Sequence, residues 1–259
     1  MFFRGDDRVI LGVRGSGRKR KVAKIVLFAI LAVLLLCAGG MALFLSDAYE
    51  PLPEIGDYLS AGGAVAVSEI DDGFFLDGPG EGDALIFYPG AKVEAAAYIP
   101  LMYRLAEGGV DVFLIEMPCN VAVLGINRAN NILRGYNYEH WYIGGHSLGG
   151  AVSAIYAAKH PGDFDGLVLL AAYSTKDLRE SGLRVLTVYG TEDGVLNRDK
   201  LRSDESLLPA DAATVVIEGG NHAQFGCYGP QKGDGTPLIS AEEQWEQTAD
   251  AVLDMIHPQ

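Results

Sequence analysis

Ser147 lies in the pentapeptide Gly145-His146-Ser147-Leu148-Gly149, which follows an apolar run and precedes a helix-like segment. A G-x-S-x-G sequence between a strand and a helix is typical of a sharp turn that exposes the serine hydroxyl. Residues 144–150 contain four glycines, which weaken a strand and a helix alike, so they indicate a turn. The chemistry of such a turn would be nucleophilic attack by Ser147, and the alternative is an ordinary glycine-rich turn.

A serine hydroxyl is a weak nucleophile until an oriented base accepts its proton. Later in the chain, Asp193 and His222 each follow an apolar run by four or five residues, which gives the expected order of serine, acid and histidine. Asp193 would hold the ring of His222 and stabilise the imidazolium. Glu192 is the alternative acid, and either acid could be a solvated turn residue. His146 is better placed to pack or to line the site than to act as the base.

The anion formed during such an attack needs two hydrogen-bond donors. One is expected to be the N–H of Leu148, directly after the serine. The other should come from the loop YPGAKVE, where Gly90 allows the chain to turn and the N–H of Ala91 to point inward. Lys92 is the alternative donor, and a plain turn from strand to helix is the other interpretation of this loop.

Strands and helices must alternate to position these residues. Six apolar, β-rich runs are continuous, as expected for strands covered on both faces; they occupy residues 84–88, 111–116, 140–143, 166–170, 184–189 and 214–217. Helical patterns occupy residues 92–107, 124–134, 148–159 and 241–256, the last with a capping box from Ser240 and Glu243. Residues 62–79 resemble an antiparallel hairpin at a sheet edge. The pattern predicts an α/β fold with a mainly parallel sheet, helices on both faces and chemistry beyond the carboxyl ends of the strands.

Charge is distributed unevenly along the chain. Residues 1–24 hold eight lysines and arginines against two aspartates, and Ile25–Leu45 has no charged residue. Because the net charge of the chain is −14, residues 46–259 carry −20. Such an acidic body argues against a nucleic-acid partner, whose phosphates it would repel.

The uncharged run of 21 residues is long enough to cross a hydrocarbon core of roughly 30 Å as a helix. The basic cluster before it predicts a cytoplasmic N-terminus and a body on the outer side of the membrane. We therefore expect a basic cytoplasmic segment (1–24), a transmembrane anchor (25–45), a linker (46–60) and one catalytic domain (61–259). A cleaved signal peptide, which would leave the domain secreted, is the alternative; the apolar run is longer than usual for one.

Three cysteines are present, and Cys37 lies within the apolar run. In an oxidising compartment Cys119 and Cys227 could form a disulfide, or each could be a lone buried thiol. The sequence shows no phosphate-binding loop, dinucleotide fingerprint or metal-ligand spacing. We therefore expect neither a cofactor nor a metal.

Residues 84–256 resemble the α/β-hydrolase superfamily, and more narrowly a compact bacterial branch of serine hydrolases related to dienelactone hydrolase and carboxylesterase. The segments FYPGAKVEAAAYIPL, GGHSLGGA, YGTEDGV and GGNHAQFGCYG carry this resemblance. Ser147 stands where dienelactone hydrolases have cysteine, so their substrate is not carried over. Only 13 residues, 171–183, separate two predicted strands where this fold commonly inserts a cap domain. The resemblance therefore implies a site without a cap.

These observations predict a membrane-anchored serine hydrolase that faces away from the cytoplasm and cleaves small-molecule or envelope esters through an acyl-enzyme. Two alternatives are open. The same three residues could transfer the acyl group to an alcohol or amine of the envelope. The chain could also be a non-catalytic, membrane-tethered binding module, since a fold alone does not prove activity.

Overall fold

The computed structural model describes residues 16–59 and 63–258, and the chain divides into two units between Ser46 and Asp47. The first unit contains one helix, α1 (Ser16–Ser46). Within it, Arg20–Gly40 is long and apolar enough to cross a membrane, and none of this stretch is buried against other parts of the chain. The helix extends beyond the predicted span of 25–45 at its N-terminal side. The basic residues before residue 16 lie outside the described part.

The second unit is built on an eight-stranded sheet with the order β1-β2-β4-β3-β5-β6-β7-β8. The strands are β1 (Ala66–Ile70), β2 (Gly73–Asp77), β3 (Asp83–Tyr88), β4 (Val110–Ile115), β5 (His140–His146), β6 (Gly166–Leu170), β7 (Arg184–Gly190) and β8 (Ala213–Ile217). Strands β3 to β8 are parallel, and β1 and β2 form an antiparallel hairpin at one edge. The carboxyl ends of β3, β5, β7 and β8 therefore meet along one side of the sheet.

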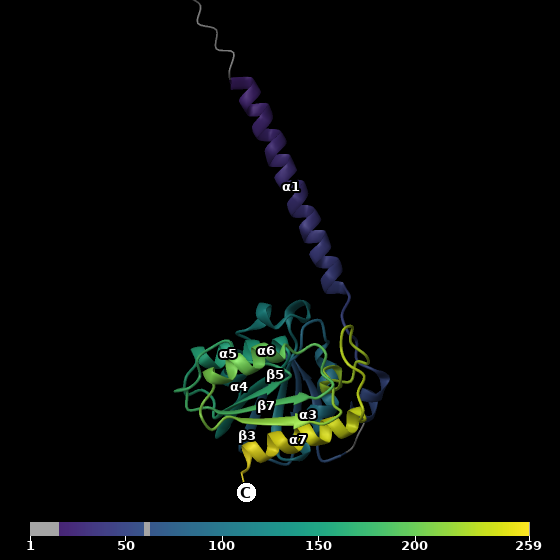
Figure 1. Ribbon diagram of the computed structural model, residues 1–259, viewed down its shortest axis with the longest axis vertical. Coiled ribbons are helices and arrows are strands. Elements are labelled where there is room, and N and C mark those ends of the chain that lie inside the picture. The colour runs from purple at the N-terminus through teal and green to yellow at the C-terminus, as the bar shows by residue number, and fades with distance from the viewer. Residues whose placement is uncertain (1–15, 60–62, 259) are drawn as a thin grey trace, which may run out of the picture. The chain divides into compact units, whose positions relative to one another are not determined.

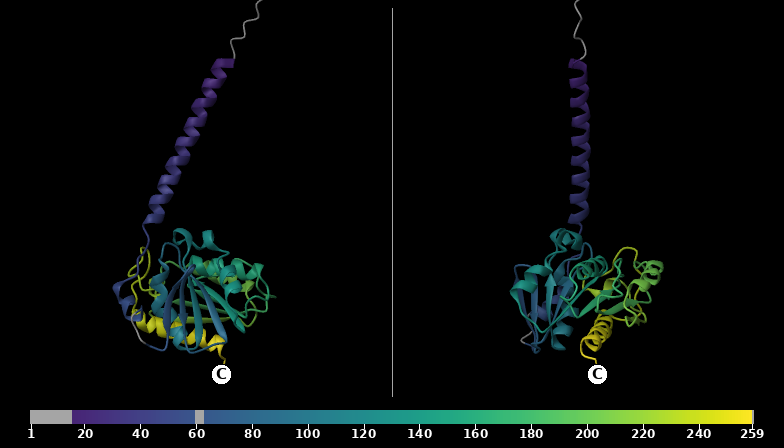
Figure 2. Two further views of the ribbon diagram at one scale, coloured as in Figure 1. Left: turned by 180° about the vertical axis from the view of Figure 1, so that it is seen from behind. Right: turned by 90° about the vertical axis from the view of Figure 1, so that its left-hand side faces the viewer.

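Helices cover both faces of the sheet (Figure 1). Helices α3 (Ile99–Glu107) and α7 (Ala241–Ile256) pack on one face, and α4 (Ala129–Gly135) and α5 (Leu148–Lys159) pack on the other. Figure 2 shows the same arrangement from two further sides, with α7 in yellow beside the sheet. Two short helices are α2 (Gly56–Leu59) and α6 (Arg198–Asp204). The described residues also include six 3-10 turns, at Pro53–Ile55, Ala95–Tyr98, Pro118–Asn120, Ala122–Gly125, Glu205–Leu207 and Ala223–Phe225.

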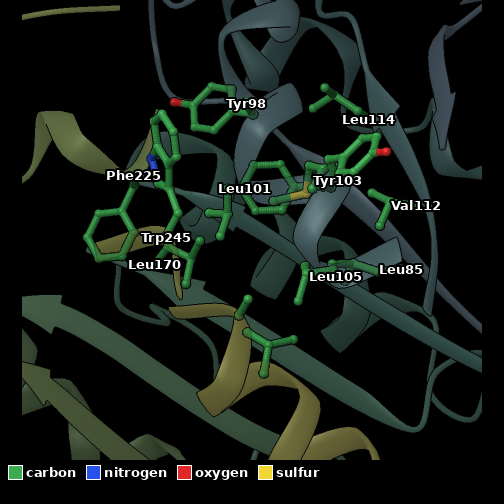
Figure 3. Close-up of a cluster of buried hydrophobic side chains, with 14 of the residues drawn as sticks. Leu85, Tyr98, Leu101, Tyr103, Leu105, Val112, Leu114, Leu170, Phe225 and Trp245 are labelled. Carbon is green, nitrogen blue, oxygen red and sulfur yellow. The ribbon is translucent and has the colours of Figure 1, made fainter. Parts of the chain in front are cut away.

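The core has two parts because neighbouring residues of a strand face opposite sides of the sheet. In β3, Leu85 and Phe87 join the cluster under α3 and α7, whereas Ala84 and Ile86 join the cluster under α5. Figure 3 shows side chains of the first cluster, among them Leu85 of β3 and Leu105 of α3. Continuous apolar strands are thus explained by burial on both faces.

The predicted strands and hairpin are confirmed, and the largest difference is in β5, which runs three residues further than expected. Two helix starts were wrong. The expected helix 92–107 begins only at Ile99, because Lys92 has a φ of 62° and Val93 pairs with Tyr49 instead. The expected helix 124–134 begins at Ala129, because the residues before it form a tight 3-10 turn.

The segment expected to be a linker is attached to the body. The N–H of Tyr49 donates to the carbonyl of Lys92 at 2.6 Å, and the Lys92 ammonium pairs with Asp47 at 3.1 Å. The N–H of Leu52 donates to the carbonyl of Cys227 at 2.9 Å. Residues 47–59 therefore belong to the second unit and help to fix the loop that follows β3.

Candidate active site

Ser147 is the single residue between the end of β5 and the start of α5, and its backbone has φ 52° and ψ −120°. Non-glycine residues rarely adopt this conformation, and strained backbone of this kind clusters at functional sites. A Cβ atom on Gly145 or Gly149 would lie 2.5 or 2.0 Å from the carbonyl oxygen of Tyr88, so only glycine fits on either side. Leu148 begins α5, and its N–H is one of the four at a helix start that have no partner within the helix.

Asp193 follows β7 and His222 follows β8, and both are buried. Nδ1 of His222 donates to Oδ2 of Asp193 at 2.8 Å. The other oxygen, Oδ1, accepts the N–H groups of Val195 and Leu196 at 2.8 and 2.7 Å, so the carboxylate is fixed at both ends. Nε2 of His222 is buried and has no hydrogen-bond partner among the described residues. The alternative acid, Glu192, instead accepts from a neighbouring hydroxyl at 3.1 Å.

A cavity of about 250 Å³ connects the candidate nucleophile and base. Ser147 and His222 both line it, and the rest of the wall is mostly apolar: Leu148, Ala151, Ala171, Ala172, Tyr173, Val195, Leu196 and Asn197. A larger hollow of about 410 Å³ is lined by neighbours of the candidate base, Asn221 and Ala223, and Ser147 is not part of its wall. The chemistry therefore belongs to the smaller cavity. Among the described residues, no group of histidines, cysteines and acids could hold a metal.

The loop after β3 distinguishes between the two candidate oxyanion donors. The N–H of Gly90 donates to the hydroxyl of Tyr98 at 3.0 Å, and the N–H of Lys92 donates to the carbonyl of Asn120 at 2.7 Å. The N–H of Ala91, between them, has no hydrogen-bond partner in the described part of the chain. This pattern favours Ala91 over Lys92.

His146 is buried directly beside the candidate base, and its ring centre lies 4.4 Å from that of His222. Its Nδ1 lies 2.7 Å from the hydroxyl of Tyr98. Burial, and secondly the charge of His222, hold the pKa of His146 well below its ordinary value of 6.5. His146 is therefore neutral at physiological pH. The sequence indicated that it would pack at the site, but gave no sign of its partner Tyr98.

Asp234 is a further residue that sequence analysis missed. Its two carboxylate oxygens accept the N–H groups of Gly194, His222 and Ala223 at 3.0, 3.2 and 2.8 Å. One side chain thus ties the loop of the acid to the loop of the base. Its position in the loop GPQKGDG, far from any apolar run, carried no signal of this role.

The disulfide considered between Cys119 and Cys227 is absent, since both residues are free thiols. Cys119 is exposed, whereas Cys227 is buried and its N–H donates to the carbonyl of Ala97 at 2.6 Å. One thiol therefore faces solvent while the other is held within the core. Burial is the largest cause that raises the pKa of Cys227, to about 11.

Comparison with solved structures gives the same fold at low sequence identity. A CIB-like hydrolase from Thermoplasma acidophilum aligns with a TM-score of 0.57 and 14% identity, over 73% of this chain and 99% of that one. Carboxylesterase CesB from Bacillus subtilis aligns with a TM-score of 0.56 and 12% identity, over 84% of this chain and 98% of that one. Dienelactone hydrolase from Anabaena variabilis aligns with a TM-score of 0.53 and 14% identity, over 74% of this chain and 98% of that one.

No curated protein sequence matches this chain significantly. A sequence model of the alpha/beta hydrolase family, in contrast, matches residues 84–246, which is more than half of the chain. This range includes the strained serine turn and both loops that carry Asp193 and His222. With the parallel sheet and its two helical layers, the match shows that the chain belongs to the alpha/beta hydrolase family.

Proposed function

We propose that this protein is a serine esterase with Ser147 as nucleophile, His222 as base and Asp193 as the residue that orients the base. One observation carries the proposal. Oδ2 of Asp193 lies 2.8 Å from Nδ1 of His222, and Nε2 of the same ring has no hydrogen-bond partner among the described residues. His222 and Ser147 line the same cavity. That is the arrangement in which a histidine can take the serine proton.

In the proposed first step, the Ser147 oxygen bonds to the ester carbonyl carbon while its proton moves to Nε2 of His222. The carbonyl oxygen becomes an anion, which the N–H groups of Ala91 and Leu148 would stabilise. Collapse of this intermediate breaks the bond to the alcohol oxygen, and His222 returns the proton to the leaving alcohol. Water then attacks the acyl-enzyme with His222 as base, which releases the acid and restores the serine.

The cavity favours a small, uncharged group on the substrate. Its volume of about 250 Å³ is below the roughly 300–1,000 Å³ typical of sites for drug-sized ligands. Small residues such as Ala171 and Ala172 line it, and no Lys or Arg is in its described wall. We therefore propose short-chain carboxylic esters as substrates, in keeping with the esterases among the structural neighbours.

We further propose that α1 anchors the enzyme in a membrane with the catalytic body on the outer side. The support is the apolar stretch Arg20–Gly40 and the excess of basic residues at its N-terminal end. Basic residues flanking a span favour the cytoplasmic side. The acidic body would then lie outside the cytoplasm, where ester substrates of the envelope are accessible.

Labelling with a fluorophosphonate probe tests the nucleophile. The full-length chain in detergent is compared with Ser147→Ala and His222→Ala, with Ser206→Ala and His160→Ala as controls in positions away from the cavity. We expect labelling of the parent and both controls, its loss in the first two variants, and hydrolysis of short p-nitrophenyl esters in parallel. A folded parent that is neither labelled nor active would show that the serine esterase assignment is wrong.

A further inference from the structure

Tyr98 and His146 form a buried pair that touches all three parts of the proposed site. The Tyr98 hydroxyl accepts the N–H of Gly90 at 3.0 Å, directly before the candidate oxyanion donor. His146 is the residue directly before Ser147, and its ring centre lies 4.4 Å from that of His222. The hydroxyl of Tyr98 lies 2.7 Å from Nδ1 of His146, so the two side chains connect the loop at Gly90 with the ring of His222.

The direction of the hydrogen bond within the pair depends on the tautomer of His146. A tyrosine hydroxyl has one proton to donate, and its oxygen already accepts from Gly90. Donation of this proton to Nδ1 of His146 would place the imidazole proton of His146 on Nε2, which is buried and has no hydrogen-bond partner among the described residues. Both side chains are fully buried, and burial raises the pKa of Tyr98 as it lowers that of His146. Neither group carries charge, so the pair adds no second imidazolium to oppose protonation of His222.

The pair packs closely against the backbone of Gly90 and against two aromatic rings. A Cβ atom on Gly90 would lie 2.8 Å from Nδ1 of His146 and 2.9 Å from the Tyr98 hydroxyl. The rings of Phe87 and Phe225 lie 5.3 and 5.5 Å from those of Tyr98 and His146, respectively. Tyr98 thus holds the loop that carries the candidate oxyanion donor, and its partner His146 packs against the candidate base.

We propose that Tyr98 and His146 act as a positioning pair that holds the oxyanion loop and the ring of the base in their relative positions. This inference rests on the proposed esterase function. Tyr98 keeps the Gly90 amide in place, so that the next amide, that of Ala91, points at the developing anion. His146 supports one side of the His222 ring. Neither side chain lines the cavity with Ser147, so both act through other residues.

The test is a double-mutant cycle in the full-length enzyme, with Tyr98→Phe, His146→Phe and the double variant. Each change keeps an aromatic ring and removes one polar partner. Removal of an oxyanion donor costs roughly 10²–10³ in kcat, and a displaced donor should cost less. We expect kcat for a short p-nitrophenyl ester to fall about 10- to 100-fold, with KM changed less than about twofold. The double variant should be no worse than the poorer single variant, because both changes break one unit.

Tyr142→Phe is the matched control. Tyr142 is also fully buried and bonded through its hydroxyl, to Arg184 at 2.6 Å, but it lies at the far end of β5 from the site. We expect it to lower the melting temperature and leave kcat unchanged. The positioning role is overturned if Tyr98→Phe and His146→Phe behave like this control, or if their losses multiply in the double variant. A parent that the fluorophosphonate does not label overturns the esterase function itself, and the pair with it.

Discussion

The orientation of Asp193 is the most sensitive feature of the site at the scale of single residues. Oδ2 accepts from His222, and Oδ1 accepts two backbone N–H groups, so an amide in its place could not satisfy all three donors. We expect Asp193→Asn to lower kcat roughly 10⁴-fold, because the amide selects the wrong tautomer of the base. Steady-state kinetics on a short p-nitrophenyl ester would measure this loss.

Glu192→Gln is the matched control for Asp193→Asn, because it makes the same chemical change one residue earlier in the chain. Its carboxylate is bonded to a neighbouring hydroxyl and not to His222. We expect its kcat to stay within about twofold of the parent. Equal losses in the two variants would contradict the assignment of Asp193 as the orienting acid.

The two thiols of the body should differ in reactivity. Cys119 is exposed, and Cys227 is buried with its pKa raised to about 11. Because thiolate is the reactive form, the raised pKa keeps the Cys227 thiol protonated and unreactive near neutral pH. We expect iodoacetamide to modify Cys119 in the native protein and Cys227 only after denaturation, as read by peptide mass mapping. A Cys119–Cys227 cross-linked peptide in unreduced protein would contradict this expectation.

The candidate triad could be predicted from the sequence because each member has a local signal. Ser147 lies between glycines, and Asp193 and His222 each follow an apolar strand closely. Asp234 and Tyr98 have no such signal, because their roles depend on hydrogen bonds to backbone groups that are distant in sequence. Only the folded chain brings those groups together.

Two loops of the site are joined by Asp234 at the scale of elements. Its carboxylate accepts N–H groups from the loop after β7, at Gly194, and from the loop after β8, at His222 and Ala223. Hydrogen bonds to a charged acceptor are roughly twice as strong as neutral ones. We expect Asp234→Asn to lower kcat/KM about tenfold and to lower the melting temperature, because one oxygen becomes an N–H group facing other N–H groups.

Kinetics and thermal unfolding of Asp234→Asn should be compared with those of Asp211→Asn, an exposed aspartate in the turn before β8. The control should leave both quantities unchanged. If Asp234→Asn lowers the melting temperature but retains the parent kcat/KM, Asp234 stabilises the fold without setting the position of the base.

The strands could be predicted more accurately than the helix starts, for a physical reason. A strand buried on both faces needs a continuous apolar run, which is visible in the sequence. The start of α3 depends instead on Tyr49, which pairs with Val93 across a long separation in sequence and keeps that segment extended. The same contact attaches residues 47–59, which were expected to be a linker, to the second unit. The helix propensity of a segment gives no information about contacts with residues that are distant in the sequence.

The chain as a whole combines an apolar helix with a strongly acidic enzyme body. The described stretch Arg20–Gly40 is long and apolar enough to cross a membrane. The body, from Asp47 onward, is a separate compact unit with its own core. We therefore expect the full-length chain in the membrane fraction, and a chain lacking residues 1–46 in the soluble fraction, with kcat/KM within about twofold of the parent.

Orientation can be measured on the full-length chain, with the truncated chain as the size reference. Protease added to intact cells without an outer membrane, or to spheroplasts, should digest the body of the full-length chain and leave a cytoplasmic control protein intact. That outcome follows from the basic residues ahead of the helix, which favour the cytoplasmic side. Protection of the body until the membrane is permeabilised would place it in the cytoplasm and contradict the proposed orientation. A full-length chain recovered at the size of the truncated one would instead show that the helix is cleaved as a signal peptide.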